Sequence, residues 1–198
     1  INELDLKTVL VETKDKEGRL PSVYIDNIEA TYEATKHLLD KGIKNIAFIG
    51  VDKSSENAWG DRYIGYEKAL NEAGITVDED LVYFEGLKVK SGYVASEKFL
   101  ASGKNFDGII CASDEIAMGA INGLREKGVN TPEDVSVIGF NDNVVASYFY
   151  PKLTTVKQPS YDMGSVAMRM LIKILNNTPL KKQKLTLNNK LIEKDIFN

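Results

Sequence analysis

The stretch Gly108-Ile109-Ile110-Cys111-Ala112-Ser113-Asp114-Glu115-Ile116 places two different patterns side by side. The run 108–111 is apolar on both faces, which is typical of a strand buried in a parallel sheet. Asp114 and Glu115 then open the segment 114–126, in which apolar residues recur at helical spacing, and we expect Asp114 to be the N-cap. A buried strand that leads directly into such a helix indicates an α/β protein.

The same unit repeats on both sides of this stretch. Apolar runs predict strands at 8–11, 22–25, 45–49, 81–84, 108–111, 135–140 and 153–156, and helical periodicity predicts helices at 28–41, 61–73, 91–101, 114–126 and 160–176. Four helices are expected to end at a glycine in the left-handed conformation, namely Gly42, Gly74, Gly103 and Gly128. The alternation predicts doubly wound, mostly parallel sheets with helices on both faces.

The repeat is unevenly distributed along the chain. The series from 27 to about 157 is sufficient for a small α/β domain, whereas the flanks supply only a few strands and one helix. We therefore expect two domains, one formed by 27–157 with 189–198 and a partial one formed by 1–26 with 158–188. We also expect the sequence to be a fragment that lacks residues before Ile1.

Composition narrows the function. The chain has 198 residues with 25 Lys+Arg and 29 Asp+Glu, a net charge of −4, which argues against binding a nucleic-acid backbone through this chain alone. No run approaches the ~18 apolar residues of a membrane span. A single cysteine, Cys111, and a single histidine, His37, argue against multi-ligand metal sites and a Ser-His-Asp triad. Glycine-rich phosphate loops are missing from the sequence. We expect neither an enzyme nor a cofactor.

Polar residues that follow the predicted strands are the candidate ligand contacts. Ligands of open α/β sheets bind outside the carboxyl ends of the strands. The residues near those ends combine a ring, a guanidinium, carboxylates, a hydroxyl and an amide, a mixture that suits sugars: Glu12, Trp59, Asp61, Arg62, Leu87, Ser113, Asn141 and Asp142. Two other interpretations stay open, since Asp114 can be purely a cap and Arg62 can brace a loop by pairing with an acid.

Four motifs occur in an order that resembles the effector-binding core of the LacI/GalR family of bacterial transcription regulators. They are Asp61-Arg62-Tyr63-Ile64-Gly65-Tyr66, Ser113-Asp114-Glu115-Ile116-Ala117-Met118-Gly119, Thr131-Pro132-Glu133-Asp134-Val135-Ser136-Val137-Ile138-Gly139-Phe140 and Pro151-Lys152-Leu153-Thr154-Thr155-Val156-Lys157-Gln158-Pro159. The resemblance implies a type I periplasmic-binding-protein-like fold of two subdomains, with the N-subdomain incomplete and the helix-turn-helix domain absent from this chain. It also implies a cytoplasmic repressor that binds a sugar or sugar phosphate in the inter-subdomain cleft and reaches its DNA operator through the missing domain.

The carry-over to individual positions is mixed. Arg62 keeps a basic position of the family, but Gly60 stands where a sugar-clamping arginine is frequent. Asn141 replaces a frequent aspartate, Ser113 a frequent asparagine and Leu87 a ring. These departures leave the identity of the effector open.

The resemblance also implies protein partners. Family members form homodimers, and the corresponding positions here are Met118, Tyr148 and Phe149. A narrower similarity, to the catabolite control protein A branch, covers Tyr161, Asp162, Arg169 and Lys173, where the branch docks the serine-phosphorylated carrier HPr. A plain solvated helix face explains these four residues as well, and we favour that interpretation.

Three functions are therefore weighed. The first is the sensing and dimerisation core of a LacI-family regulator. The alternatives are the sugar-binding protein of an importer, which shares the fold, and a regulator driven mainly by phosphorylated HPr. An enzyme is the weakest interpretation.

Overall fold

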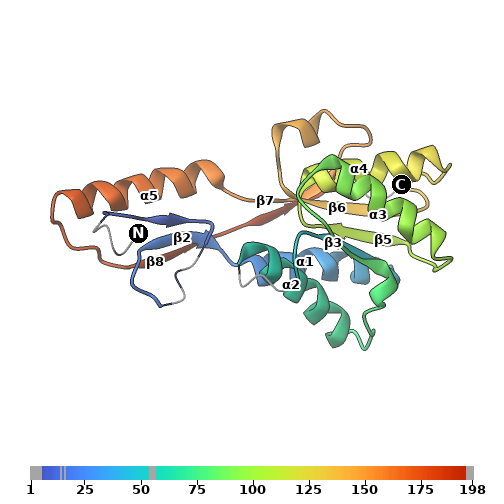
Figure 1. The fold of residues 1–198 in the computed structure, drawn as a ribbon, viewed down its shortest axis with the longest axis horizontal. Coiled ribbons are helices and arrows are strands. Elements are labelled where there is room, and N and C mark those ends of the chain that lie inside the picture. The colour runs from blue at the N-terminus through green and yellow to red at the C-terminus, as the bar shows by residue number, and fades with distance from the viewer. Residues whose placement is uncertain (1–5, 14, 16, 54–56, 195–198) are drawn as a thin grey trace. The chain divides into compact units, whose positions relative to one another are not determined.

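The computed structural model describes residues 6–13, 15, 17–53 and 57–194, so the predicted domain ends at 1–5 and 195–198 lie outside the described residues. It divides into two compact units, one of residues 1–26 with 158–189 and one of 27–157 with 190–198. Figure 1 shows the elements of both.

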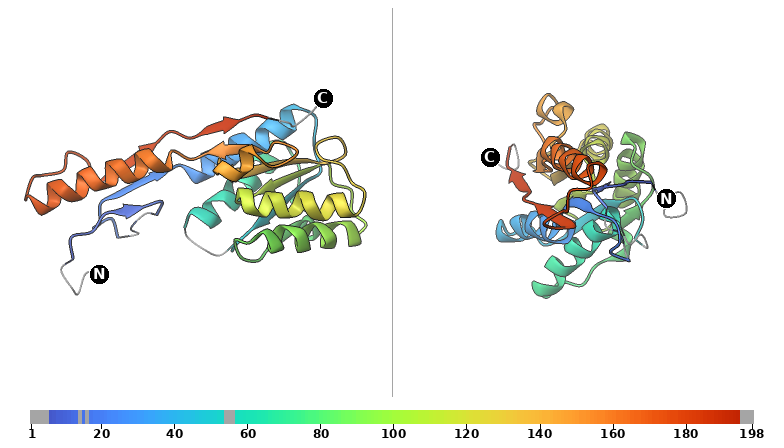
Figure 2. Two further views of the ribbon diagram at one scale, coloured as in Figure 1. Left: turned by 90° about the horizontal axis from the view of Figure 1, so that it is seen from above. Right: turned by 90° about the vertical axis from the view of Figure 1, so that its left-hand side faces the viewer.

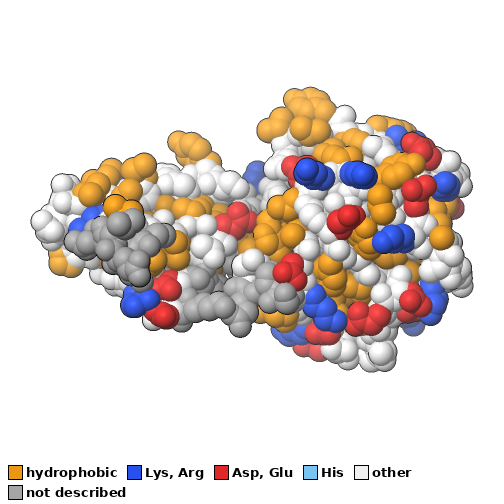
Figure 3. Space-filling view, in the orientation of Figure 1, with side chains coloured by type: hydrophobic (Ala, Val, Ile, Leu, Met, Phe, Trp, Pro, Cys, Tyr) orange, Lys and Arg blue, Asp and Glu red, His pale blue; other side chains and the backbone are white. Residues whose placement is uncertain are grey.

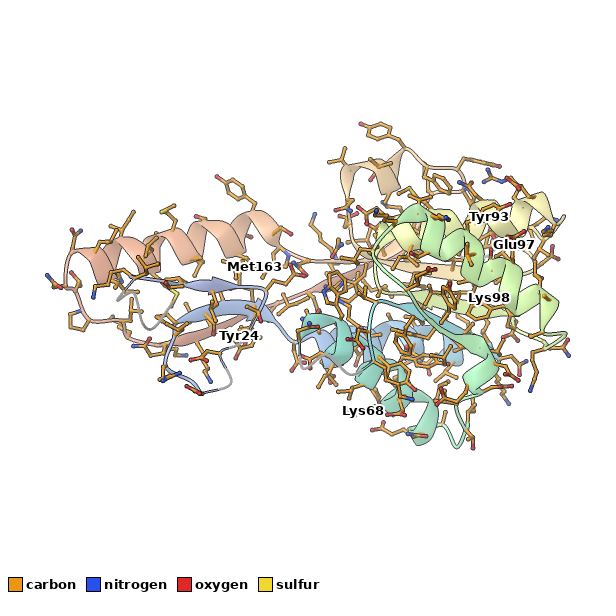
Figure 4. The ribbon with its side chains drawn as sticks, viewed as in Figure 1. Tyr24, Lys68, Tyr93, Glu97, Lys98 and Met163 are labelled. Atoms are coloured by element: carbon orange, nitrogen blue, oxygen red, sulfur yellow. The ribbon has the colours of Figure 1, made fainter. Side chains whose placement is uncertain are left out.

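The smaller unit is a three-stranded parallel sheet in the order β1-β2-β8. Its strands are β1 (Leu10–Val11), β2 (Ser22–Ile25) and β8 (Lys184–Leu187). Helix α5 (Ser160–Leu175) packs against β1 and β2 through a buried stripe that includes Met163, labelled in Figure 4. Strand β8 alternates between exposed and half-buried residues, which indicates a sheet with little core of its own.

The larger unit is a six-stranded sheet in the order β4-β3-β5-β6-β7-β9. Its strands are β3 (Ile46–Gly50), β4 (Val82–Phe84), β5 (Gly108–Cys111), β6 (Ser136–Asn141), β7 (Thr154–Lys157) and β9 (Lys190–Ile192). All neighbours pair in parallel except β7 and β9, which are antiparallel. The predicted doubly wound, mostly parallel sheet is confirmed, and the antiparallel pairing of the tail is an addition to it.

Two pairs of helices cover the faces of this sheet (Figures 1 and 2). One pair is α1 (Asn27–Asp40) with α2 (Ala58–Glu72), and the other is α3 (Val89–Ala101) with α4 (Asp114–Glu126). The short 3-10 turns η2 (Glu79–Leu81) and η3 (Val144–Ser147) precede β4 and follow β6. The predicted glycine ends are confirmed, because Gly42, Gly74, Gly103 and Gly128 all have positive φ.

The helix pairs approach so closely that glycine is required at the contacts. A Cβ added to Gly119 of α4 would lie 1.8 Å from the carbonyl oxygen of Val89, and one added to Gly65 of α2 would lie 2.2 Å from that of Ile28. Side chains extend the α3–α4 contact, since the Tyr93 hydroxyl donates to Glu126 at 2.6 Å (Figure 4). Each helix pair is therefore closely packed over its face of the sheet.

An aromatic cluster fills the core between α2 and the strands. The ring of Phe48 lies 5.4 Å from Tyr63, 5.1 Å from Tyr66 and 6.0 Å from Phe84, measured between centroids. The Tyr66 hydroxyl donates to the carbonyl oxygen of Ile46 at 2.6 Å, which satisfies its one polar atom. This cluster fixes α2 on the sheet and thereby places the residues at the start of that helix.

Candidate functional site

The carboxyl ends of β3, β5, β6 and β7 meet at one edge of the larger sheet, because these four strands are parallel neighbours. Ser113 follows β5, and Asn141 ends β6 beside Lys157 of β7. The first turn of α2 supplies Trp59, Asp61 and Arg62. We call this group of strand ends and helix starts the carboxyl-end edge.

Arg62 connects three parts of this edge. Its Nε donates to Asn27 Oδ1 at 2.9 Å, and its Nη1 donates to the carbonyl oxygen of Ala112 at 2.6 Å. The guanidinium carbon lies 3.6 Å from the ring centre of Phe140 and 4.6 Å from that of Trp59. The residue is 0% exposed. Arg62 thus braces the edge through the Asn27 amide, the Ala112 backbone and two aromatic rings. The alternative pairing with a neighbouring acid stays a prediction.

The start of α2 is set by Asn57, which was not predicted. Its side-chain oxygen accepts from the backbone N–H of Trp59 at 2.9 Å and caps the helix, so α2 begins three residues before the expected start at 61. This cap turns Trp59 into a first-turn residue, half-buried against Arg62.

The prediction that Asp114 is the N-cap of α4 is wrong. Ser113 is the cap, since its hydroxyl accepts from the N–H of Ile116 at 3.3 Å, and Asp114 is the first helical residue. Both residue types cap well, and the choice falls on Ser113 because Asp114 is drawn into contacts with other elements.

Asp114 holds the turn that follows β6. Its Oδ1 accepts from the Thr155 hydroxyl at 2.5 Å, and its Oδ2 accepts from the N–H of Asn143 at 2.7 Å. Burial raises the pKa of Asp114 to about 6, although the hydrogen bonds from Thr155 and Asn143 act in the opposite direction. One buried carboxyl therefore links β7 to the turn at 141–143.

That turn has an unusual backbone. Asn141 and Asp142 have φ angles of 111° and 55°, a region that Asn and Asp tolerate better than other non-glycine residues. The Asp142 carboxylate lies 3.5 Å from Lys157 Nζ and 3.6 Å from Lys194 Nζ. Backbone strain held in place by surrounding contacts is frequent at ligand sites.

The remaining predicted contacts are Asp61, Leu87 and Glu12. Asp61 is half-buried in the first turn of α2, and Leu87 is exposed before α3. Glu12 follows β1 in the smaller unit, also with a positive φ. Arg62 contacts Trp59, Ala112 and Phe140, and the last two are the chain neighbours of the predicted residues Ser113 and Asn141. Sequence reasoning missed Asn27, Asn143 and Thr155, whose partners lie 28 to 41 positions away.

The predicted dimer residues differ in exposure. Met118 is 8% exposed and is covered by its own chain, whereas Tyr148 is 85% exposed. Phe149 is half-buried, with the Arg125 guanidinium 5.9 Å from its ring centre. Figure 3 shows hydrophobic side chains projecting at the top of the view, where the segment after β6 lies. The geometry leaves Met118 little surface for a partner, and the dimer stays a prediction.

The predicted docking residues lie on α5. Tyr161 and Asp162 are exposed in its first turn, and Arg169 and Lys173 are exposed one turn apart. The Arg169 guanidinium donates to Ser165, to its carbonyl oxygen at 3.3 Å and to its hydroxyl at 3.4 Å. Arg169 and Lys173 border a groove of about 490 Å³ whose other cationic residues are Lys181 and Lys182.

The single cysteine and the single histidine are withdrawn from solvent to different degrees. Cys111 is buried, and burial raises the pKa of its thiol well above the ordinary value, which disfavours the nucleophilic thiolate. His37 is half-buried on α1, where burial lowers its pKa, with Nε2 3.7 Å from Glu193 Oε1. Within the described ranges, no three His, Cys, Asp or Glu residues gather as metal ligands, and no helix is long and apolar enough to cross a membrane.

Comparisons with known proteins agree with this architecture. The model of the periplasmic binding protein-like domain matches residues 35–195. The chain is 63% identical over 195 residues to the HTH-type transcriptional regulator RegA of Clostridium saccharobutylicum, which covers 98% of this chain and 59% of that protein. It is 36% identical over 168 residues to catabolite control protein A of Priestia megaterium, which covers 85% of this chain and 51% of that protein. The chain thus spans little more than half the length of these relatives.

Solved structures give the same assignment. The transcription regulator CcpA of Lactococcus lactis superposes with a TM-score of 0.91 at 34% identity, covering 100% of this chain and 72% of that one. The transcriptional regulator CelR in complex with cellobiose superposes with a TM-score of 0.89 at 31% identity. The match covers 96% of this chain and 58% of that chain. On these grounds the chain belongs to the periplasmic binding protein-like family, within the LacI/GalR group of transcription regulators.

Proposed function

We propose that this chain is the effector-sensing core of a DNA-binding transcription regulator and that a sugar or sugar phosphate binds at the carboxyl-end edge. The observation that carries the proposal is that Trp59 stacks on Arg62, which also packs on Phe140, the residue directly before Asn141. Among the described residues, neither the Trp59 indole nor the Asn141 amide makes a side-chain hydrogen bond. A ring beside unused amide groups suits a sugar, which offers C–H faces and hydroxyls.

Binding would regulate DNA affinity by population shift. A ligand that binds one arrangement of a regulator more tightly than another moves the equilibrium by its difference in affinity. RegA is an HTH-type transcriptional regulator and extends beyond the matched region, so DNA contact and homodimer formation are proposed for the whole protein. The location of the effector in a cleft between two subdomains also stays a prediction.

Thermal unfolding with a panel of sugars tests the proposal. A ligand at about 100 times its dissociation constant adds about 2.7 kcal/mol to the free energy of unfolding, which raises the melting temperature by several degrees. Asn141→Ala should remove that shift, whereas Asn122→Ala, on the far part of α4, should keep it. A panel in which no sugar raises the melting temperature of the chain would contradict the proposal.

A second candidate function, docking of serine-phosphorylated HPr on α5, is favoured by one observation. Arg169 and Lys173 are exposed and lie beside Lys181 and Lys182 around a single groove. Clustered cations on an apolar floor suit a phosphate-bearing protein. Arg169→Ala with Lys173→Ala should abolish binding of phosphorylated HPr in calorimetry, while the control Lys36→Ala should not. Unchanged binding would remove this candidate.

Importer and enzyme functions are not what we propose. The importer's binding protein shares the fold, but RegA, the relative at 63% identity, is an HTH-type transcriptional regulator. The buried thiol of Cys111 lies on β5 and the half-buried His37 lies on α1. Turnover of any sugar by the purified chain would overturn this part of the proposal.

A further inference from the structure

We propose that the effector is an uncharged sugar rather than a phosphorylated one, an inference that rests on the function proposed above. The carboxyl-end edge contains the groups that normally bind phosphate, namely an arginine, helix N-termini and lysines. In this chain, most of those groups are already paired with its own carboxylates, amides or carbonyl oxygens. The following contacts carry the argument.

Arg62 is the only arginine at this edge within the described residues, and it is not presented to solvent. Arginine binds phosphate through its planar fork of N–H donors. Here Nε and Nη1 donate to Asn27 and to Ala112, and the guanidinium plane lies between the rings of Phe140 and Trp59. A phosphate would have to displace the Trp59 ring and compete with these bonds.

The helix N-termini at the centre of this edge carry their own acids. The first turn of α2 contains Asp61, and that of α4 contains Asp114 and Glu115. A carboxylate in the first turn occupies the favourable potential that would otherwise attract an anion. A phosphate brought there meets like charge instead.

The lysines near the edge are paired as well. Lys157 and Lys194 both lie within 3.6 Å of the Asp142 carboxylate, and Lys53 lies 3.1 Å from Glu79. Lys194 also donates to the Ser147 hydroxyl at 3.1 Å. Binding a phosphate through these lysines would require breaking ion pairs that the fold already makes.

Uncharged chemistry is what remains. Trp59 offers a ring, and the Asn141 amide offers two donors and an acceptor on a turn fixed by Asp114 and Thr155. Both groups recognise hydroxyls and C–H faces and need no charge on the ligand.

One place departs from this pattern. The N-cap of α3 is Lys88, which makes no side-chain capping bond, and the first turn of α3 has no acid. This turn follows β4, the edge strand of the sheet, rather than β5 or β6. It is the position where a phosphorylated sugar would bind if the inference is wrong.

Fluorescence titration separates the two ligand classes, because Trp59 is the one tryptophan of the sequence. The probes are matched pairs that differ by one phosphate: glucose with glucose 6-phosphate, fructose with fructose 6-phosphate and cellobiose with cellobiose 6-phosphate, with inorganic phosphate alone as a further probe. We expect a neutral member to change the Trp59 emission and its phosphorylated partner to bind at least about tenfold more weakly, because like charges face it.

The outcomes are distinguishable. Equal or tighter binding of a phosphorylated member overturns this inference and leaves the proposed function intact, and its loss in Lys88→Ala would locate the phosphate at α3. Neutral binding that persists unchanged in Asn141→Ala contradicts the site at the carboxyl-end edge, and with it the contacts from which the uncharged ligand is inferred. Failure of all probes to bind, by fluorescence and by calorimetry, contradicts the proposed function itself.

Discussion

The two units of the molecule differ in how many of their strand residues are buried. In the larger unit, every residue of β3 and of β5 is buried, and helices cover both faces of the sheet. In the smaller unit, β8 has no buried residue, and α5 packs on β1 and β2. Burial of apolar surface is the main source of stability, so the larger unit carries most of the folding free energy. The candidate edge belongs to that stable unit.

Phe48→Ala is expected to cause the largest loss in the free energy of unfolding of the larger unit. The substitution removes the ring that contacts Tyr63, Tyr66 and Phe84 and leaves a cavity at the centre of the larger unit. We expect the free energy of unfolding to fall by about 3–5 kcal/mol. Urea denaturation followed by Trp59 fluorescence measures it, and a loss of less than about 1 kcal/mol would place the main core elsewhere.

Asp114 tests how tightly the candidate edge is tied to the larger unit. Its folded-state pKa of about 6 lies above the unfolded value of 3.8, so its contribution to stability is full below pH 3.8 and is lost as the pH rises through about 6. The shift corresponds to about 3 kcal/mol. Relative to Asp114→Asn, which does not titrate, the wild-type free energy of unfolding should fall between pH 4 and pH 7.5.

Urea titrations of both proteins at the two pH values give this difference, and the other carboxyl groups cancel because both proteins carry them. A difference between the two proteins that does not change with pH would show that Asp114 is not buried as described.

Met163→Ala tests the smaller unit. Met163 is 1% exposed between α5 and the sheet, and its loss should cost about 2 kcal/mol, because a site beneath a single helix can partly collapse. We expect faster amide exchange in 22–25 and 160–175 with the Trp59-detected transition of the larger unit unmoved. An equal shift of that transition would mean that the two units unfold together.

Lys36→Ala should cause the smallest loss in the free energy of unfolding, and it serves as the reference for a surface substitution. Lys36 Nζ lies 2.6 Å from the Asp40 carboxylate, an exposed pair one turn apart on α1. Exposed pairs of this kind contribute little to the free energy of unfolding, because solvent and salt screen the charges. The loss should shrink at high salt, and a loss as large as that of Met163→Ala would show that surface charge matters as much here as burial does.

The elements could be predicted where the signal is local. The bounds of β2 and β5 agree with the expected apolar runs, and those of α4 agree with the expected helix. These elements were predictable because hydrophobic periodicity depends only on residues close together in the sequence. The pairing of β7 with β9 joins 155–157 to 190–192, and no local pattern indicates it. The cap of α4 was misassigned because the contacts that draw Asp114 away come from Asn143 and Thr155.

In the candidate site, too, local features were predictable and contacts between distant residues were not. Residues near the ends of strands were predictable, since the carboxyl ends of parallel strands share one edge. The burial of Arg62 was not, because it depends on Phe140 and Asn27, which lie 78 and 35 positions away in the sequence. Local spacing predicts which residues reach the edge, whereas packing decides which of them still have unused groups there.

Amide hydrogen exchange with and without a saturating sugar tests the central claim most directly. The sugar is the one that gives the largest rise in melting temperature in the panel. We predict added protection at 57–62, 112–114 and 141–143, around Trp59, Arg62 and Asn141, with α5 unchanged. Protection that appears on α5 and is missing from these three segments would contradict the account.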